Sequence, residues 1–198
     1  MLNLYKDEAI HKMIDSKSNG CIESYGRILI CATSSYLEMF FVLDEKNAQK
    51  LHLILKALTD NKTIIGVPAL KSLEDDIGLL LNSVIEIGDN AAEFSLHVAQ
   101  YFIEYLSDGD KDKIKYMDIS FLNVSDYIAQ EHELKKDHAT ESEIEQSQIM
   151  TAYRSLRNRV LEYCDKDTNE VQSIAQDQQK SLCSEYVDIV KRYTSITR

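Results

Sequence analysis

Residues 44–60, with the sequence DEKNAQKLHLILKALTD, carry the clearest helical pattern in the chain. Their apolar side chains recur at intervals of three and four residues, from Ala48 through Leu51 and Leu55 to Leu58. This spacing places them on one face of an α-helix. Asp44 stands just before the pattern, where a carboxylate can accept the free backbone N–H groups of a helix N-terminus. The segment therefore predicts an amphipathic helix packed against a core.

The same periodicity continues along most of the chain on both sides of this segment. Pro68 suits the first turn of the next helix, and Gly88 suits the position just after its end. Asn90, with an acid three residues on at Glu93, predicts another helix start. We expect these and the remaining helices over residues 4–14, 68–87, 90–108, 110–128, 140–163 and from about 167 to 193.

Two segments are ambiguous by periodicity alone. Residues 22–42 predict a buried helix, but the short apolar runs at 28–30 and 40–42 are also compatible with strands. Residues 64–67 could form a short extended segment before the proline. One proline and six glycines in 198 residues argue against a turn-rich β fold. We therefore predict an all-α fold, in which residues 1–198 form a single domain of seven to eight antiparallel helices.

The charge balance restricts the classes of partner. The chain has 22 basic and 33 acidic residues, a formal net charge of −11, and both halves carry an excess of acids. Nucleic acids and anionic lipids are bound by basic surfaces, so neither is an expected partner. A protein with a basic surface would be attracted by this charge, although an acidic surface also serves solubility.

Cysteine spacing and apolar segments give expectations about environment. No two of the four cysteines form a Cys-x-x-Cys pair, which disfavours a zinc ribbon or a thioredoxin-like motif. The early acids Asp7 and Glu8 disfavour a signal peptide, and the longest apolar stretch, residues 28–43, is short for a membrane helix. We expect a cytoplasmic protein whose cysteines are buried as small apolar residues, while a dedicated secretion route stays open.

Residues 131–145 form the densest polar segment. On one continuous helix Glu131, His138, Glu141 and Glu145 would share a face that could hold a metal ion. However, Thr140 with Glu143 forms a capping box, which predicts that a new helix starts there and breaks this face. No His-Glu-x-x-His motif is present. A solvated corner between helices, an acidic contact patch for a partner and a metal site are the three interpretations, in that order.

Other chemical motifs are incomplete. One Glu-x-x-His, Glu8 with His11, has no second copy of the kind that di-iron bundles use. His97 lies among aromatic residues, which is typical of a hydrogen-bonded histidine at a core boundary. The basic cluster Arg154, Arg157 and Arg159 has no histidine at the spacing of a helical ribonuclease, so we expect ion pairs within its helix or with a neighbouring one.

Several stretches resemble the YjaG-like family of uncharacterised all-helical bacterial proteins. They are residues 35–40, the helix at 47–58, the segment GVPAL at 66–70 leading into the leucines at 79–81, and residues 141–161. Together they cover about half of the chain. The resemblance implies an all-helical fold and carries no activity. The chain departs from the family in having no tryptophan and only a short connector, residues 61–65.

We predict a non-enzymatic protein-binding module without a cofactor, in its concrete form an immunity-type or antitoxin-like protein. Its acidic surface would neutralise a basic toxin, for example a nuclease. The predicted partner-binding residues are Asp126, Tyr127, Glu131, Glu133, Asp137, Glu141 and Glu145. One alternative is a metal-dependent or otherwise uncharacterised helical-bundle enzyme that uses Glu8, His11, Glu131, His132 or His138. The other is a structural homo-oligomer, such as a homodimer formed through a spare apolar helix face.

Overall fold

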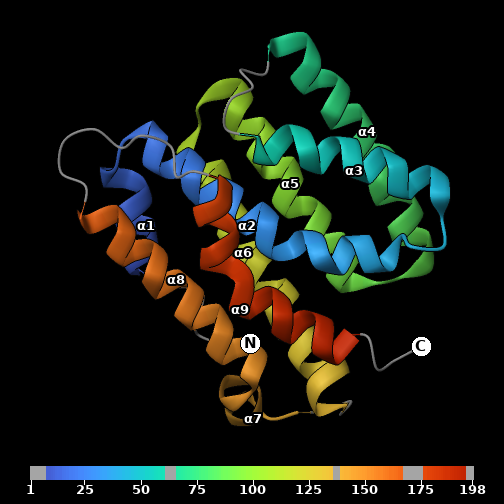
Figure 1. Ribbon diagram of the computed structural model, residues 1–198, viewed down its shortest axis with the longest axis vertical. Helices are drawn as coiled ribbons and strands as arrows, with labels where there is room; N and C mark the ends of the chain where they lie inside the picture. Colours follow the sequence, from blue (N-terminus) through green and yellow to red (C-terminus); the bar gives the residue numbers. More distant parts are fainter. Residues whose placement is uncertain (1–7, 61–65, 136–138, 167–175, 195–198) are drawn as a thin grey trace.

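The computed structural model describes residues 8–60, 66–135, 139–166 and 176–194, and the regular structure in these ranges is entirely helical (Figure 1). The predicted all-α bundle is therefore confirmed. The elements are α1 (Glu8–Ser16), α2 (Asn19–Phe40), α3 (Glu45–Thr59), α4 (Val67–Ile87), α5 (Asn90–Asp108), α6 (Lys111–Ile128), the π-helical turn η2 (Ala129–Leu134), α7 (Glu141–Gln146), α8 (Gln148–Lys166) and α9 (Gln176–Thr194).

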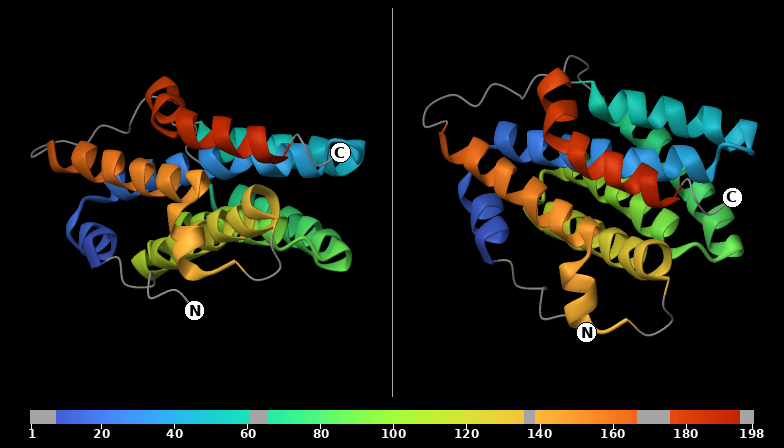
Figure 2. Two further views of the ribbon diagram at one scale, coloured as in Figure 1. Left: turned by 90° about the horizontal axis from the view of Figure 1, so that it is seen from below. Right: turned by 60° about the horizontal axis from the view of Figure 1, so that its bottom comes forward.

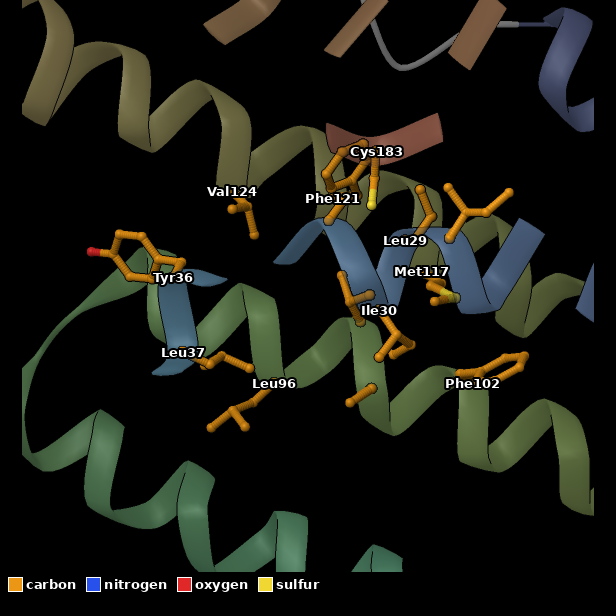
Figure 3. Close-up of a cluster of buried hydrophobic side chains, with 14 of the residues drawn as sticks. Leu29, Ile30, Tyr36, Leu37, Leu96, Phe102, Met117, Phe121, Val124 and Cys183 are labelled. Atoms are coloured by element: carbon orange, nitrogen blue, oxygen red, sulfur yellow. The ribbon is translucent and has the colours of Figure 1, made fainter. Parts of the chain in front are cut away.

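Helix α2 is the centre of the bundle. It packs against α3, α5, α6 and α9, and 14 of its 22 residues are buried. Figure 2 shows two layers, with α2, α3, α8 and α9 in one and α4, α5 and α6 in the other. The buried side chains between the layers include Leu29, Ile30 and Leu37 from α2 and Leu96 and Phe102 from α5 (Figure 3). No helix in the described part of the chain is both long enough and apolar enough to cross a membrane.

Most predicted helix boundaries agree with the structure because local side-chain chemistry sets them. The carboxylate of Asp44 accepts a hydrogen bond from the backbone N–H of Asn47 at 3.1 Å and caps α3. Gly88 ends α4 in the left-handed conformation, which glycine adopts without steric cost. Thr140 and Glu143 form the predicted capping box of α7.

Among the boundaries that differ from the prediction, two have a clear local cause, whereas α2 runs over Asn19–Phe40 instead of 22–42 and α8 extends to Lys166. Asn90 is the first helical residue of α5, and Asp89 is its N-cap, because the Asp89 carboxylate accepts from the backbone N–H of Ala92 at 2.9 Å. The single helix predicted over residues 140–163 is broken at Ser147, whose extended backbone (ψ 155°) separates α7 from α8. This break gives nine α-helices in the described ranges, one more than the upper predicted number.

The ambiguous segments are resolved where the structure describes them. The apolar run 28–30 lies inside α2, and Phe40 ends that helix, so neither run forms a strand. Gly66 is extended (ψ 156°) and Val67 begins α4, while the rest of the predicted extended segment lies outside the described residues. The predicted starts of the first and the last helix, at residue 4 and about residue 167, also lie outside the described residues. The structure describes these helices from Glu8 and Gln176. Cys21 and Cys183 are buried as predicted, and Cys31 is half-buried.

Candidate functional site

A cavity of about 470 Å³ opens at one end of the bundle, where several elements meet. The C-terminal part of α2, the turn that follows it, the N-cap of α3, the C-terminal part of α4 and the N-cap of α5 supply most of its wall. The π-helical turn η2 and the last residue of α9 close the remaining side. Its apolar walls are formed by Met39, Phe40, Phe41, Leu43 and Ile87. A concave, mainly apolar pocket with a few convergent polar groups is typical of a binding site.

Three polar side chains from distant parts of the sequence meet in this cavity. The Tyr36 hydroxyl donates to the Asp89 carboxylate, with oxygen–oxygen distances of 3.0 and 3.2 Å, and lies 3.4 Å from Nε2 of His132. Figure 3 shows that Tyr36 sits at the edge of the buried cluster with its hydroxyl directed away from it. The rings of Tyr36 and His132 are in edge-to-face contact, with centroids 6.0 Å apart.

Burial determines the protonation states in this triad. It raises the pKa of Tyr36 well above its usual range, and the neighbouring Asp89 carboxylate adds to the effect. Burial lowers the pKa of His132 below its usual value, against the opposing influence of Asp89 and Glu131. At neutral pH the cavity therefore contains a protonated phenol and a neutral imidazole. A phenol held in this form is a poor nucleophile.

The π-helical turn places His132 in the cavity. Helix α6 continues directly into η2, whose C-cap Lys135 is the one described non-glycine residue with positive φ (51°). π-helical turns are rare and are often found at functional sites. The ring of Tyr127 on α6 is also in edge-to-face contact with His132, with ring centroids 6.5 Å apart. The predicted aromatic anchor thus contacts a residue that lines the cavity but does not line it itself.

The other predicted partner-binding residues are spread over this corner of the fold. Glu131, Glu141 and Glu145 are exposed, and α7, which carries the last two, packs against η2. Asp126 is half-buried, and burial raises the pKa of its carboxyl group. Asp137 lies outside the described residues. The structure therefore brings Tyr127, Glu131 and His132 next to the cavity and leaves Asp126 facing the interior.

Glu133 has a structural role that the sequence did not reveal. Its carboxylate accepts hydrogen bonds from the backbone N–H groups of Gln148 at 2.8 Å and Ile149 at 3.1 Å, the first two residues of α8. The Ser147 hydroxyl accepts from the third, Met150, at 3.2 Å. Together the two side chains accept hydrogen bonds from the first three backbone N–H groups of α8, which have no partner within the helix.

We expect Glu133→Ala to lower the free energy of unfolding by about 1 kcal/mol, the usual cost of losing an N-terminal cap. Urea denaturation followed by circular dichroism measures the change. The control is Glu131→Ala, because Glu131 lies in the same π-helical turn and is exposed. Its substitution should change the free energy by less than about 0.5 kcal/mol. Equal effects of the two variants would contradict the capping role.

The predicted metal ligands do not come together in the described residues. No group of three or more His, Cys, Asp or Glu side chains in these ranges is arranged to hold a metal ion. His138 lies outside the described residues, and Lys135 ends η2 before Thr140 starts α7, so Glu131 and Glu141 are on separate helices. His97 is half-buried and hydrogen-bonded to Gln100 at 3.1 Å, as expected for a boundary histidine.

The arginine cluster pairs mainly with neighbouring helices, one of the two predicted arrangements. Arg159 contacts Glu185 of α9 at 3.1 Å. Arg157 is buried and donates to Asp118 of α6 at 2.9 Å, and the Asp118 carboxylate also accepts from the Tyr25 hydroxyl of α2. The ion pair and the Tyr25 hydroxyl together connect α8, α6 and α2. Because the three residues lie far apart in the sequence, no local pattern predicted this contact.

The sequence also gave little indication of Tyr36 and Asp89. The available signal was their position, because Asp89 directly follows the helix stop Gly88 and Tyr36 follows the polar residues that interrupt the longest apolar stretch.

Comparison with known proteins identifies no family for this chain: no protein-family model, no curated protein and no solved structure matches it. The resemblance to the YjaG-like family remains a prediction from the stretches quoted above.

Proposed function

We propose that this protein is a non-enzymatic binding module of the immunity or antitoxin type, which neutralises or regulates a protein with a basic surface. The observation that supports this proposal best is the apolar mouth of the cavity. Leu43 and Ile87 line it with side chains that are 90% and 69% exposed. Large apolar side chains that remain in water at the rim of a pocket are typical of surfaces that a partner covers.

Two acidic groups line the cavity beside this apolar mouth, and others flank its lining residues in the sequence. Asp44 and Asp89 line the same cavity, and Glu45, Glu86 and Glu131 are exposed residues next to lining residues in the sequence. An apolar centre with a polar rim is the usual anatomy of a protein interface. Acidic groups inside such a rim favour a basic partner and accelerate the encounter. The net charge of −11 extends this preference over the whole surface.

Helix α4 offers a matched pair of substitutions that tests the proposal. Ile87 and Val67 lie at opposite ends of this helix, about 30 Å apart by helical rise, and both are 69% exposed. Because Ile87 lines the cavity, Ile87→Lys should weaken the partner's binding at least about tenfold, which corresponds to about 1.4 kcal/mol. Val67→Lys introduces the same charge away from the cavity and should leave the affinity unchanged.

The measurement begins with affinity capture of the partner from a lysate of the source organism at low and high salt. Isothermal titration calorimetry with the purified partner follows. A partner that leaves the wild-type chain as salt rises, discriminates between the two variants and loses its toxicity or activity on co-expression supports the proposal. A partner that binds both variants equally contradicts it. So does light scattering that finds a homodimer which Ile87→Lys dissociates, because this surface would then serve self-association.

A further inference from the structure

The three hydroxyl groups of the residues that line the cavity share one property: each already donates its hydrogen to an acceptor within the protein. The Ser83 hydroxyl donates to the Leu80 carbonyl at 2.8 Å, and the Thr194 hydroxyl donates to the Val190 carbonyl at 2.7 Å. The Tyr36 hydroxyl donates to Asp89. Each hydroxyl has one hydrogen, so towards the cavity these three oxygens can only accept.

The two carboxylates and the imidazole extend this pattern. Asp44 and Asp89 have only acceptor atoms. Because Tyr36 gives its hydrogen to Asp89, the hydrogen between Tyr36 and His132 must belong to Nε2 of the imidazole. Nδ1 of this neutral imidazole is then unprotonated, so the ring brings no second donor to the cavity. The polar lining of the cavity thus calls for a ligand rich in hydrogen-bond donors.

Charge and aromatic surface specify the ligand further. Among the described residues that line the cavity, none is lysine or arginine, so the carboxylates of Asp44 and Asp89 share the cavity with no permanently charged cation. Phe40 and Phe41 stand edge to face beside them, with ring centroids 4.9 Å apart. Aromatic rings attract cations to their faces. A cationic donor is therefore favoured over a neutral one.

We propose that this cavity is the anchor site for an arginine side chain of the partner protein. The guanidinium group carries five N–H donors in one plane and can reach several separate acceptors while stacking on an aromatic ring. The ammonium of lysine is a compact charge with three donors and lacks the stacking surface. This inference rests on the proposed function, since the exposed Leu43 and Ile87 would contact the partner's surface around the inserted arginine.

Three small probes test the chemistry of the cavity: the blocked amino acids N-acetylarginine methylamide, N-acetyllysine methylamide with a free ε-amine, and N-acetylcitrulline methylamide. Binding is followed by NMR shifts of the His132 and Tyr36 ring signals. A probe of this size should bind with a dissociation constant on the order of 1 mM. We expect the arginine probe to bind most tightly and the neutral citrulline probe to bind at least about tenfold more weakly.

A double variant without the two carboxylates tests whether the arginine probe binds in this cavity. Asp44→Asn with Asp89→Asn removes both carboxylates but keeps the helix caps, since asparagine is as good an N-cap as aspartate. The matched control is Asp110→Asn, which changes the N-cap of α6 at the end of that helix away from η2. The double variant should bind the arginine probe at least about tenfold more weakly, and the control should bind it like the wild type. Thermal unfolding curves verify that each variant is folded.

Competition between the arginine probe and the partner distinguishes a partner's arginine from a free guanidinium compound as the natural ligand. Displacement of the captured partner by excess arginine probe, together with weaker partner binding by the double variant, supports the inference. Absence of arginine binding in the wild-type chain, or equal binding by the double variant, overturns it; the Ile87 result then still decides the proposed function. Probe binding without any effect on a partner assigns the cavity to a free guanidinium compound and overturns the inference as well.

Discussion

Replacing Arg157 with methionine should lower the free energy of unfolding by about 3–5 kcal/mol, the largest effect that we expect from a single substitution. The Arg157 guanidinium lies 2.9 Å from the Asp118 carboxylate, and the two side chains are only 7% and 5% exposed. Methionine fills a similar volume but leaves the Asp118 charge inside the core without its counterion. The Tyr25 hydroxyl, which also donates to Asp118, cannot neutralise a full negative charge.

Two further variants distinguish this cause from a loss of packing. Arg159 lies two residues after Arg157 on α8, and Arg159→Met removes its ion pair with Glu185 of α9. These two side chains are 33% and 51% exposed. The substitution should cost less than about 1 kcal/mol because water screens the pair. Adding Asp118→Asn to Arg157→Met removes the stranded charge and should recover a large part of the lost stability. Urea denaturation measures all three variants, and an Arg157→Met cost no greater than that of Arg159→Met would contradict the prediction.

Gly26→Ala should destabilise the protein by about 1–3 kcal/mol, although alanine normally favours a helix over glycine. A Cβ atom on Gly26 would lie 2.5 Å from Cδ2 of Phe102, well inside van der Waals contact. Phe102 has little freedom to move, because it is fully buried, stacks on Tyr105 and lies 5.6 Å from the Arg27 guanidinium. The glycine lets α2 and α5 approach each other closely.

Gly78→Ala in α4 is the matched control. A Cβ atom there would meet nothing within 4 Å, so the substitution should stabilise the protein by about 0.5–1 kcal/mol through helix propensity alone. Opposite signs for the two glycines in thermal or urea unfolding are the expected result. A stabilising Gly26→Ala would show that Phe102 can move aside without cost, and would contradict the close-packing argument.

The elements of the fold were predictable because local features determine them. Asp44, Pro68, Gly88 and the capping box at Thr140 each act within a few residues, so reading the sequence in short windows detects them. The break at Ser147 was not predictable in this way. It depends on Glu133, which lies 14 residues earlier and supplies the hydrogen bonds that let α8 start anew.

The candidate site was only partly predictable, for the same reason. The acidic segment around Glu131 and the aromatic Tyr127 lie at the corner of the molecule where the cavity opens. However, the cavity depends on Tyr36, Asp89 and His132, which are separated by 53 residues and then by 43. Helical periodicity shows which face of a helix is buried, but it carries no information about which helix ends meet. The π-helical turn that directs His132 inward also leaves no pattern in the sequence.

The contact between α2 and α9 has a consequence for how the chain folds during synthesis. Helix α2 is synthesised more than a hundred residues before α9, yet α9 covers one of its long sides (Figure 1). Until α9 has left the ribosome and docked, this apolar side of α2 has no native cover. The nascent chain therefore exposes apolar surface over that interval, which favours aggregation unless a chaperone covers it or α9 docks rapidly.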